Sequence, residues 1–226
     1  MHLREAAPHP AQQLNLPDYP DQVFDTCPTS PSPDAIAAFW ADAKIRAKLN
    51  RIEAYGGQSV ADTLPPPAWS FGDDPATADR LLGLVLAGRK TATASALRDY
   101  EEEARERARA DAGGPADGDL LIDTELDLAL PEPGLLSILL DGAGRPRALI
   151  RTTDVQVVRF GDVTAEHARR EGEDAGLLSQ WRRTHQEFFE RTSPDPVDED
   201  TMVVLERFEV LVPADARRAA RRHGLA

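Results

Sequence analysis

The segment that most restricts the fold lies at residues 135–160, where two apolar runs flank a tight turn. The first run is LLSILL, the turn is Asp141-Gly142-Ala143-Gly144, and the second run is RALIRTTDVQVVRF. A short glycine-rich turn between two such runs is typical of a β-hairpin. The stretch TMVVLERFEVLV at 201–212 alternates apolar and polar residues and predicts a further strand. We therefore expect a largely antiparallel sheet at the centre of the fold.

Helical patterns surround these strands. Residues 34–49 repeat apolar side chains at three- and four-residue steps, and Asp74-Pro75 is a start signal for a helix that we expect to end at Gly88. Thr164 is the expected N-cap of TAEHARREG, and LLSQWRRTHQEFFER follows as a second helix. The charged stretch DYEEEARERARADAGG predicts a solvated helix. Few strands among many helices, with antiparallel connections, predict an α+β fold built on a small barrel or curled sheet.

The chain divides by composition into an arm, one domain and a tail. Residues 1–33 lack apolar periodicity and are expected to form a partly disordered or surface-packed arm without a catalytic group. A chain starting at Pro33 should then keep its fold and any activity. Residues 34–212 form the predicted domain, within which 114–131 are an insertion, and residues 213–226 form a short basic tail. The arm holds seven prolines: Pro8, Pro10, Pro17, Pro20, Pro28, Pro31 and Pro33.

Charge and composition narrow the functional classes. Acidic residues outnumber basic ones 39 to 26, a formal net charge of −13, which opposes binding of duplex DNA. The single cysteine, Cys27, excludes an intramolecular disulfide and a multi-cysteine metal site. No apolar run approaches the roughly 20 residues of a membrane span, and no signal peptide is apparent. We expect a cytoplasmic protein with no cofactor, no metal and no membrane partner, and the oligomeric state stays open.

The segment LAGRKTATAS at 86–95 places a lysine, two threonines and a serine directly after the helix end at Gly88. Such a junction suits either a surface loop or an active site. Lys90 beyond a helix C-terminus could simply complement the helix dipole, worth about 0.3–1 kcal/mol. In a strand, Thr91, Thr93 and Ser95 share one face, although a bend after Thr91 would let Lys90 and Thr93 converge.

Several ordered blocks of this sequence resemble the ASCH domain family of the PUA-like superfamily. The resemblance extends from about Phe39 to Val210. It rests on Phe39-Trp40, Trp69 with FGDDP, LAGRKTATAS, LLSILLDGAG, the strand ending VVRF, the EGE of 171–173, WRRTHQEFF and MVVLERFEV. The family pattern has Gly-Asp before the hairpin's first strand, whereas here Gly134 is followed by Leu135. The resemblance implies a small β-barrel flanked by helices.

The resemblance also implies site residues and two activities. Small bacterial members hydrolyse the amide of N(4)-acetylcytidine with a lysine, a threonine and a glutamate, which match Lys90, Thr93 and Glu171. Other members bind or cut single-stranded RNA through the same lysine. Substrate-binding roles would fall to residues near the motif: Trp69, Arg89, Thr91 and Ser95.

Each assignment has a structural alternative. Glu171 and Glu173 lie in a charged EGED stretch that would ordinarily be a solvated helix end, His167 is expected at the surface, and His185 on a helix face. If Glu171 is ionised beside Lys90, it raises the lysine pKa, and Lys90 then suits oxyanion stabilisation better than proton abstraction.

Three functions therefore stay open. The first is an amidohydrolase acting on a small nucleoside-like ligand. The second is a single-stranded RNA-binding protein or ribonuclease, and the third is a non-catalytic ligand- or partner-binding module. If the protein is a hydrolase, Lys90→Ala is expected to lower turnover, while its free energy of unfolding stays within about 1 kcal/mol of that of the wild type.

Overall fold

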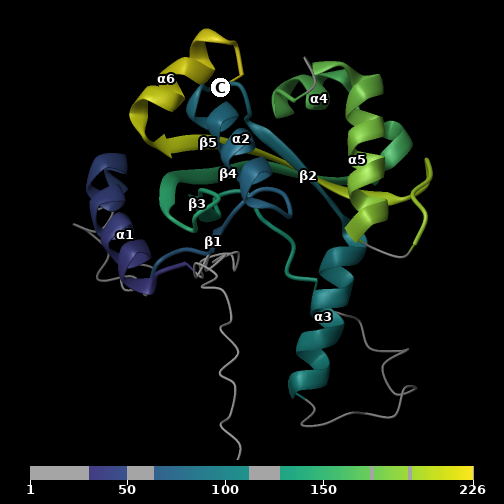
Figure 1. Cartoon of the computed structure of the whole chain (residues 1–226), viewed down its shortest axis with the longest axis horizontal. Helices are drawn as coiled ribbons and strands as arrows, with labels where there is room; N and C mark the ends of the chain where they lie inside the picture. The colour runs from purple at the N-terminus through teal and green to yellow at the C-terminus, as the bar shows by residue number, and fades with distance from the viewer. Residues whose placement is uncertain (1–30, 50–63, 112–127, 174–175, 193–194, 226) are drawn as a thin grey trace, which may run out of the picture.

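The computed structural model describes residues 31–49, 64–111, 128–173, 176–192 and 195–225. Most of the 1–33 arm and most of the 114–131 insertion, including LLIDTELDLAL up to residue 127, lie outside the described residues. The described chain contains six α-helices and five strands (Figure 1). No helix in these ranges is long and apolar enough to cross a membrane.

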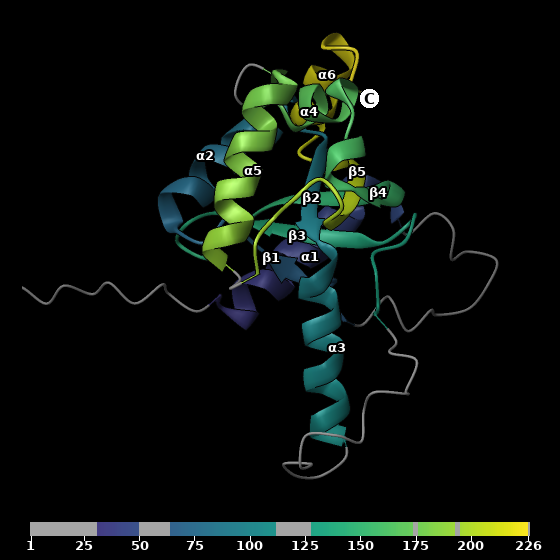
Figure 2. The ribbon, with the colours of Figure 1, turned by 90° about the vertical axis from the view of Figure 1, so that its right-hand side faces the viewer.

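A single five-stranded sheet with the order β1-β3-β4-β5-β2 forms the centre of the fold. The predicted hairpin is present as β3 (Leu136–Leu140) and β4 (Pro146–Arg159), and the closing strand is β5 (Met202–Val212). Strand β1 (Ala68–Trp69) pairs in parallel with β3, and β2 (Ala92–Ala96) pairs antiparallel with β5. Shifts of register along β4 bend this long strand. The sheet is curled and roughly barrel-like without closing, so the α+β prediction is confirmed (Figure 2).

The helix boundaries follow local signals in the sequence. Helix α1 (Pro33–Ala47) begins after Ser32, and α2 (Pro75–Leu86) begins after Asp74, whose carboxylate accepts the N–H groups of Ala76 and Thr77 at 2.9 and 3.0 Å. Helix α2 ends at the predicted place, since Gly88 has a positive φ of 68°. Helix α3 (Leu97–Asp111) is the charged helix and projects away from the sheet (Figure 2).

Three further helices from the C-terminal part of the chain pack on the sheet. Helix α4 (Ala165–Glu171) is capped by Thr164, which accepts the N–H of His167, and ends at Gly172. Helix α5 (Leu178–Thr192) follows it. The range expected as a basic tail contains helix α6 (Ala214–Arg222), which buries Ala216, Ala219 and Ala220 and exposes Asp215, Arg218, Arg221 and Arg222.

Hydrophobic clusters on the sheet fix these elements. One cluster joins α2 to β3, β4, β5 and α6 through Leu82, Val85, Phe208 and Ala216. A second packs α4 and α5 on β2 and β5 around Trp181 and Phe189. Burial of side chains of this size contributes about 1.5–3 kcal/mol each. The two clusters therefore hold α2 and α5 against the helix–strand junction at residues 87–92.

Candidate functional site

The helix–strand junction after α2 turns Lys90 into the interior. Gly88 lies against α6, and a Cβ added there would be 2.2 Å from the Ala220 nitrogen, so only glycine fits. The backbone N–H of Thr91 donates to the Arg170 carbonyl at 2.7 Å, and the N–H of Phe208 donates to the Thr91 carbonyl at 2.9 Å. These bonds fix the junction between α4 and β5. Lys90 consequently points inward and its side chain is 1% exposed.

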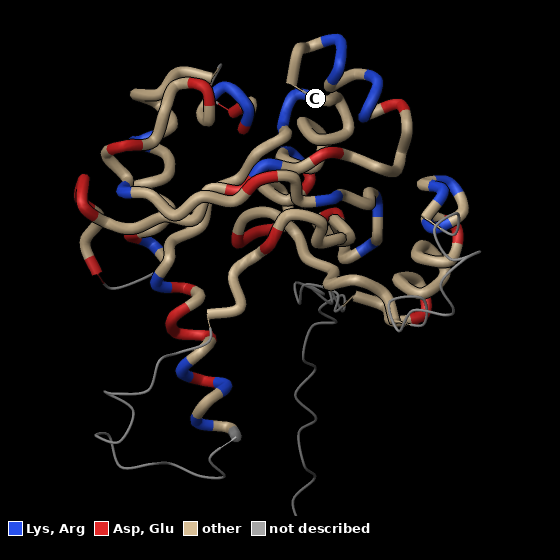
Figure 3. The backbone as a smooth tube through the Cα atoms, turned by 180° about the vertical axis from the view of Figure 1, so that it is seen from behind, with Lys and Arg blue, Asp and Glu red and all other residues tan. Residues whose placement is uncertain are grey.

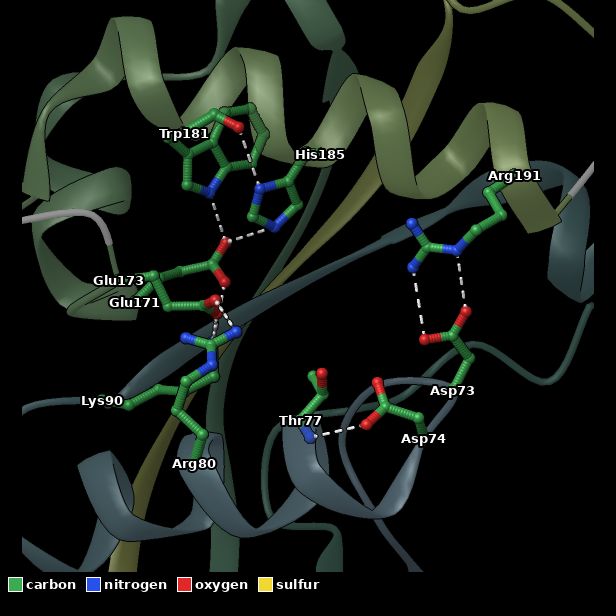
Figure 4. Close-up of polar contacts among 10 residues, drawn as sticks. All are labelled: Asp73, Asp74, Thr77, Arg80, Lys90, Glu171, Glu173, Trp181, His185 and Arg191. Atoms are coloured by element: carbon green, nitrogen blue, oxygen red, sulfur yellow. Dashed lines mark hydrogen bonds and ion pairs between the residues drawn. The ribbon is translucent and has the colours of Figure 1, made fainter.

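Two carboxylates meet the buried ammonium group. Lys90 Nζ donates to Glu171 Oε2 at 2.8 Å and to Glu173 Oε1 at 2.9 Å (Figure 4). It also lies 5.2 Å from the centroid of the Phe71 ring. Burial by itself disfavours the ammonium form, but the charges of Glu171 and Glu173, with their hydrogen bonds, raise the pKa of Lys90 above its usual value. Lys90 is therefore a fixed cation at neutral pH.

The glycine between the glutamates explains how both reach the lysine. Gly172 caps α4 with a φ of 70°, and a Cβ at this position would lie 2.2 Å from the Arg89 carbonyl oxygen. The chain reverses there, so Glu171 and Glu173 approach the same ammonium from either side of the cap. On sequence alone Glu173 was expected to be solvated, and it was missed as a site residue. The Glu-Gly-Glu pattern at the end of a helix is the signal that could have found it.

Glu171 is held by donors from two helices. Trp181 Nε1–H donates to Oε1 at 2.7 Å, His167 Nε2 lies 3.1 Å from Oε1, and His185 Nε2 lies 3.5 Å from it. Burial raises the pKa of Glu171, but the charges of Lys90 and His185, with hydrogen bonds from His167 and His185, hold that pKa well below its usual range. Glu171 is therefore ionised, and both of its carboxylate oxygen atoms already have hydrogen-bond partners.

Of the two histidines, His185 lies on a helix face as expected, whereas His167 does not lie at the surface. His167 was expected at the surface and is 2% exposed, because α4 turns it inward toward Glu171. His185 is on the buried face of α5, where its ring stacks on Trp181 at 4.1 Å and its Nδ1–H donates to the Trp181 carbonyl at 3.0 Å.

A cavity of about 190 Å³ lies above this group, between α2 and α5. Lys90, Thr93 and Glu171 all line it, so the structure brings these three predicted residues together. Glu173 and His185 also line the cavity, as do the aromatic side chains Phe71 and Phe188. Both aromatic residues were missed as site residues because nothing in their local sequence marks a cavity wall.

Two arginines lie at the entrance. Arg80 of α2 donates to Glu173 Oε2 at 3.4 Å, and Arg191 of α5 makes a two-point bond to Asp73 at 2.9 and 3.2 Å (Figure 4). The Arg191 guanidinium, through its hydrogen bonds and charge, lowers the pKa of Asp73. Each of these two arginines is therefore paired with a carboxylate.

The four predicted substrate-binding residues do not line this cavity. Trp69 packs edge-on against Phe71 at 4.8 Å and belongs to the core, and Ser95 hydrogen-bonds with Tyr100. Thr91 is 2% exposed, and its Oγ1 has no hydrogen-bond partner among the described residues. Arg89 is exposed and lines a different cavity, because adjacent residues at the junction point to opposite sides.

Among the described residues, no three His, Cys, Asp or Glu side chains are arranged to hold a metal ion. The polar groups that line the 190 Å³ cavity are thus a fixed ammonium, a histidine, two guanidinium groups, three carboxylates and three hydroxyls: Lys90, His185, Arg80, Arg191, Glu171, Glu173, Glu187, Thr77, Thr93 and Thr184.

A curled five-stranded sheet flanked by helices, with a cavity at a helix–strand junction, defines this protein as an α+β domain with a buried cationic site. A family model described as the ASCH domain matches residues 67–113 and 122–212, more than half of the chain. The chain belongs to the ASCH domain family, which is RNA-related.

Solved structures include similar proteins. Protein EF3133 from Enterococcus faecalis V583, of the family DUF984, is 28% identical, with a TM-score of 0.57 over 80% of this chain and 93% of that chain. An ASCH domain from Lactobacillus crispatus JV V101 is 24% identical, with a TM-score of 0.49 over 74% of this chain and 94% of that chain. The comparison with curated proteins gave no significant match.

Proposed function

We propose that this protein is an amidohydrolase that removes the acyl group from an acylated nucleobase, with N(4)-acetylcytidine as the model substrate. The observation that carries the proposal is that Lys90, Thr93 and Glu171 line one cavity. They are also the residues that match the lysine, threonine and glutamate of the small bacterial ASCH hydrolases.

The size and walls of the cavity suit one base. About 190 Å³ is less than the roughly 300–1,000 Å³ that encloses a drug-sized ligand. A base with its acyl group would enter while the ribose stays outside. Phe71 and Phe188 supply aromatic walls, and base–aromatic stacking is worth about 1–3 kcal/mol per base.

In this proposal Thr93 is the nucleophile and Lys90 the electrostatic stabiliser. The Thr93 Oγ1 attacks the acyl carbon, and the ammonium of Lys90 favours the negative charge that develops on the acyl oxygen. Cleavage of the C–N bond transfers the acyl group to Thr93 as an ester and releases the base amine. Water then hydrolyses the ester to the free acid and regenerates Thr93.

Glu173 has fewer partners than Glu171, and we assign to it the role of accepting the Thr93 proton and passing it to the leaving amine. Glu171 has its oxygens occupied by Lys90, His167 and Trp181. Glu173 has two partners, and one of them, Arg80, is a 3.4 Å contact from a half-exposed side chain. Glu171 then serves as the positioning residue for Lys90.

Turnover of N(4)-acetylcytidine by the wild-type protein and its Thr93 and Lys90 variants tests the proposal. Thr93→Ala and Thr93→Ser separate loss of the hydroxyl from loss of the methyl group. We expect Thr93→Ala to lower kcat at least about 100-fold and Thr93→Ser to keep measurable turnover. Lys90→Arg retains the positive charge, so partial activity is expected if the lysine is a stabiliser, whereas a dead arginine variant would indicate a lysine base.

Wild-type protein that leaves acylated cytidines intact would overturn the hydrolase proposal. Lys90-dependent cutting of short single-stranded RNA under those conditions would identify a ribonuclease. The same cavity without either activity would be a ligand-binding site.

A further inference from the structure

Glu206 of β5 lies beside Thr93 in the sheet. The pairing of β2 with β5 places these two residues directly opposite each other. Side chains of opposite residues in an antiparallel pair lie on the same face of the sheet, with their Cβ atoms about 4.5–5.5 Å apart. The residue proposed as the nucleophile therefore has a carboxyl group as its cross-strand neighbour.

Thr93 lies where the Lys90 cavity meets this face of the sheet. Its side chain lines the cavity, whereas Glu206 is not among the described residues that line it. Thr93 and Glu206 are both partly exposed. A substrate thus reaches Thr93 from the cavity, and water reaches it from the face that carries Glu206.

Glu206 differs from the carboxylates of the cavity floor in having no cation. Glu171 and Glu173 both accept hydrogen bonds from the ammonium group of Lys90. A bonded cation stabilises the ionised carboxylate and so weakens it as a base. In the described part of the chain, the carboxylate of Glu206 has one hydrogen-bond partner and no salt bridge. That partner is Thr152, whose Oγ1–H donates to Oε2 at 2.7 Å.

Burial among uncharged neighbours favours the basic character of Glu206. Burial raises the pKa of Glu206, and the hydrogen bond from Thr152 offsets only part of this rise. The titratable neighbour from α3 is Tyr100, and burial raises the pKa of its phenol, which is neutral at pH 7. The neighbours from β2 and β4, Thr93 and Thr152, carry no charge. A carboxylate in this setting accepts a proton near neutral pH more readily than one bonded to lysine.

We propose that Glu206 is the general base for the second step of the reaction, in which water attacks the acyl ester on Thr93. Glu206 takes one proton from the water, and the water oxygen bonds to the ester carbon. The bond from that carbon to Thr93 Oγ1 then breaks, and the proton on Glu206 passes to Oγ1. The products are the free acid and the regenerated hydroxyl. This inference rests on the proposed hydrolase function.

Two carboxylates would thus serve the two steps from two sides of Thr93. Glu173 acts from the cavity, where the acylated base is bound. The released base still occupies the cavity when the ester has just formed, so water has its more direct approach along the face of Glu206.

The test is steady-state and burst kinetics of Glu206→Gln with N(4)-acetylcytidine. Loss of a base that serves only the second step lowers kcat and KM together and leaves kcat/KM near the wild-type value, because kcat/KM depends on the steps up to acyl transfer. We expect kcat to fall about 100-fold, the low end for a removed acid–base group. A burst of free cytidine equal to the amount of enzyme should precede the slow phase, and intact-protein mass spectrometry should detect the acyl-enzyme. Glu173→Gln should instead lower kcat/KM and accumulate no acyl-enzyme.

Glu209→Gln is the matched control and should have wild-type kinetics. Glu209 is the other glutamate of β5, points to the opposite face of the sheet and pairs with Arg151 of β4. Figure 3 shows acidic and basic segments interspersed along these central strands.

Thermal unfolding separates a catalytic effect from a structural one. A carboxyl group whose folded pKa is raised contributes stability below its unfolded pKa of about 4.3 and loses that contribution as pH rises through the folded value. At pH 7, Glu206→Gln should therefore melt no lower than the wild type although it turns over slowly.

A Glu206→Gln variant with the wild-type kcat, or one whose kcat/KM falls as far as its kcat, would overturn the inference. Turnover that depends on Thr93 but not on Glu206 would leave the hydrolase proposal standing and remove only the role of Glu206. Wild-type protein that leaves acylated cytidines intact would overturn both. The two failures are therefore distinguishable.

Discussion

At the scale of single residues, Lys90 has the largest expected effect on stability. The sequence alone led us to expect that Lys90→Ala leaves the free energy of unfolding within about 1 kcal/mol. The structure changes this expectation, because the Lys90 side chain is 1% exposed and pairs with two buried carboxylates. Removal of the lysine would leave the negative charges of Glu171 and Glu173 buried without their cation. We now expect a loss of about 3 kcal/mol or more, measured by urea unfolding at pH 7.

The control for this prediction is Arg105→Ala on α3, which breaks an exposed pair with Glu101. Exposed pairs contribute at most about 1 kcal/mol. A Lys90→Ala loss as small as that of Arg105→Ala would show that water reaches the two carboxylates in the variant.

Glu171 gives a prediction about pH. Its pKa is depressed in the folded protein, so its contribution to stability is present above the unfolded pKa of about 4.3 and disappears as pH falls through the lower folded value. Glu171→Gln should therefore be less stable than wild type at pH 7, and the difference should shrink as pH is lowered below about 4. Urea unfolding of both proteins at several pH values measures this difference. A difference that grew toward acid pH would indicate a raised pKa instead.

At the scale of elements, the contact between the α2 end and α6 depends on Gly88. Gly88→Ala adds a Cβ 2.2 Å from the Ala220 nitrogen in addition to the cost of a positive φ. Gly224 has nearly the same φ, 67°, with nothing within 4 Å of an added Cβ. Gly224→Ala should lose only the conformational cost, about 1–2 kcal/mol, and Gly88→Ala clearly more. Thermal unfolding of the two variants makes the comparison, and equal losses would mean that α6 can move away at little cost.

The same contact explains why the chain end forms a helix. Three alanines spaced along DARRAARR let α6 approach the backbone at Gly88 closely, and the arginines stay outside. The composition predicts the basic character of this range. The packing of its alanines against Gly88 explains why the range is helical.

At the scale of the whole molecule, the division of the chain makes a prediction about the arm. Ser32 Oγ accepts the Ala35 N–H at 3.4 Å as the N-cap of α1, so a chain starting at Ser32 retains every described element. We expect it to melt within a few degrees of the full chain and to keep its turnover of N(4)-acetylcytidine. Loss of turnover with unchanged melting would assign a functional role to residues 1–31.

Sequence patterns determined the local elements of this protein. The hairpin turn at 141–144, the Asp74 cap with the stop at Gly88, and the Thr164 cap depend on neighbours within a few residues, whose steric and hydrogen-bonding preferences are visible in the sequence. The family resemblance added Lys90, Thr93 and Glu171, which the structure brings to one cavity.

Only the tertiary structure determined which side chains are buried and which residues pair with each other. Sequence charge suggested that Glu173 and His167 were solvated, yet both turn inward because α4 and α5 pack on β2 and β5. Trp69 entered the core rather than the cavity, since pairing of β1 with β3 directs it against Phe71. A buried charged side chain needs a counter-charge close to it. Lys90 finds its counter-charges in Glu171 and Glu173, about 80 residues further along the chain, and only the packed tertiary structure brings these residues together.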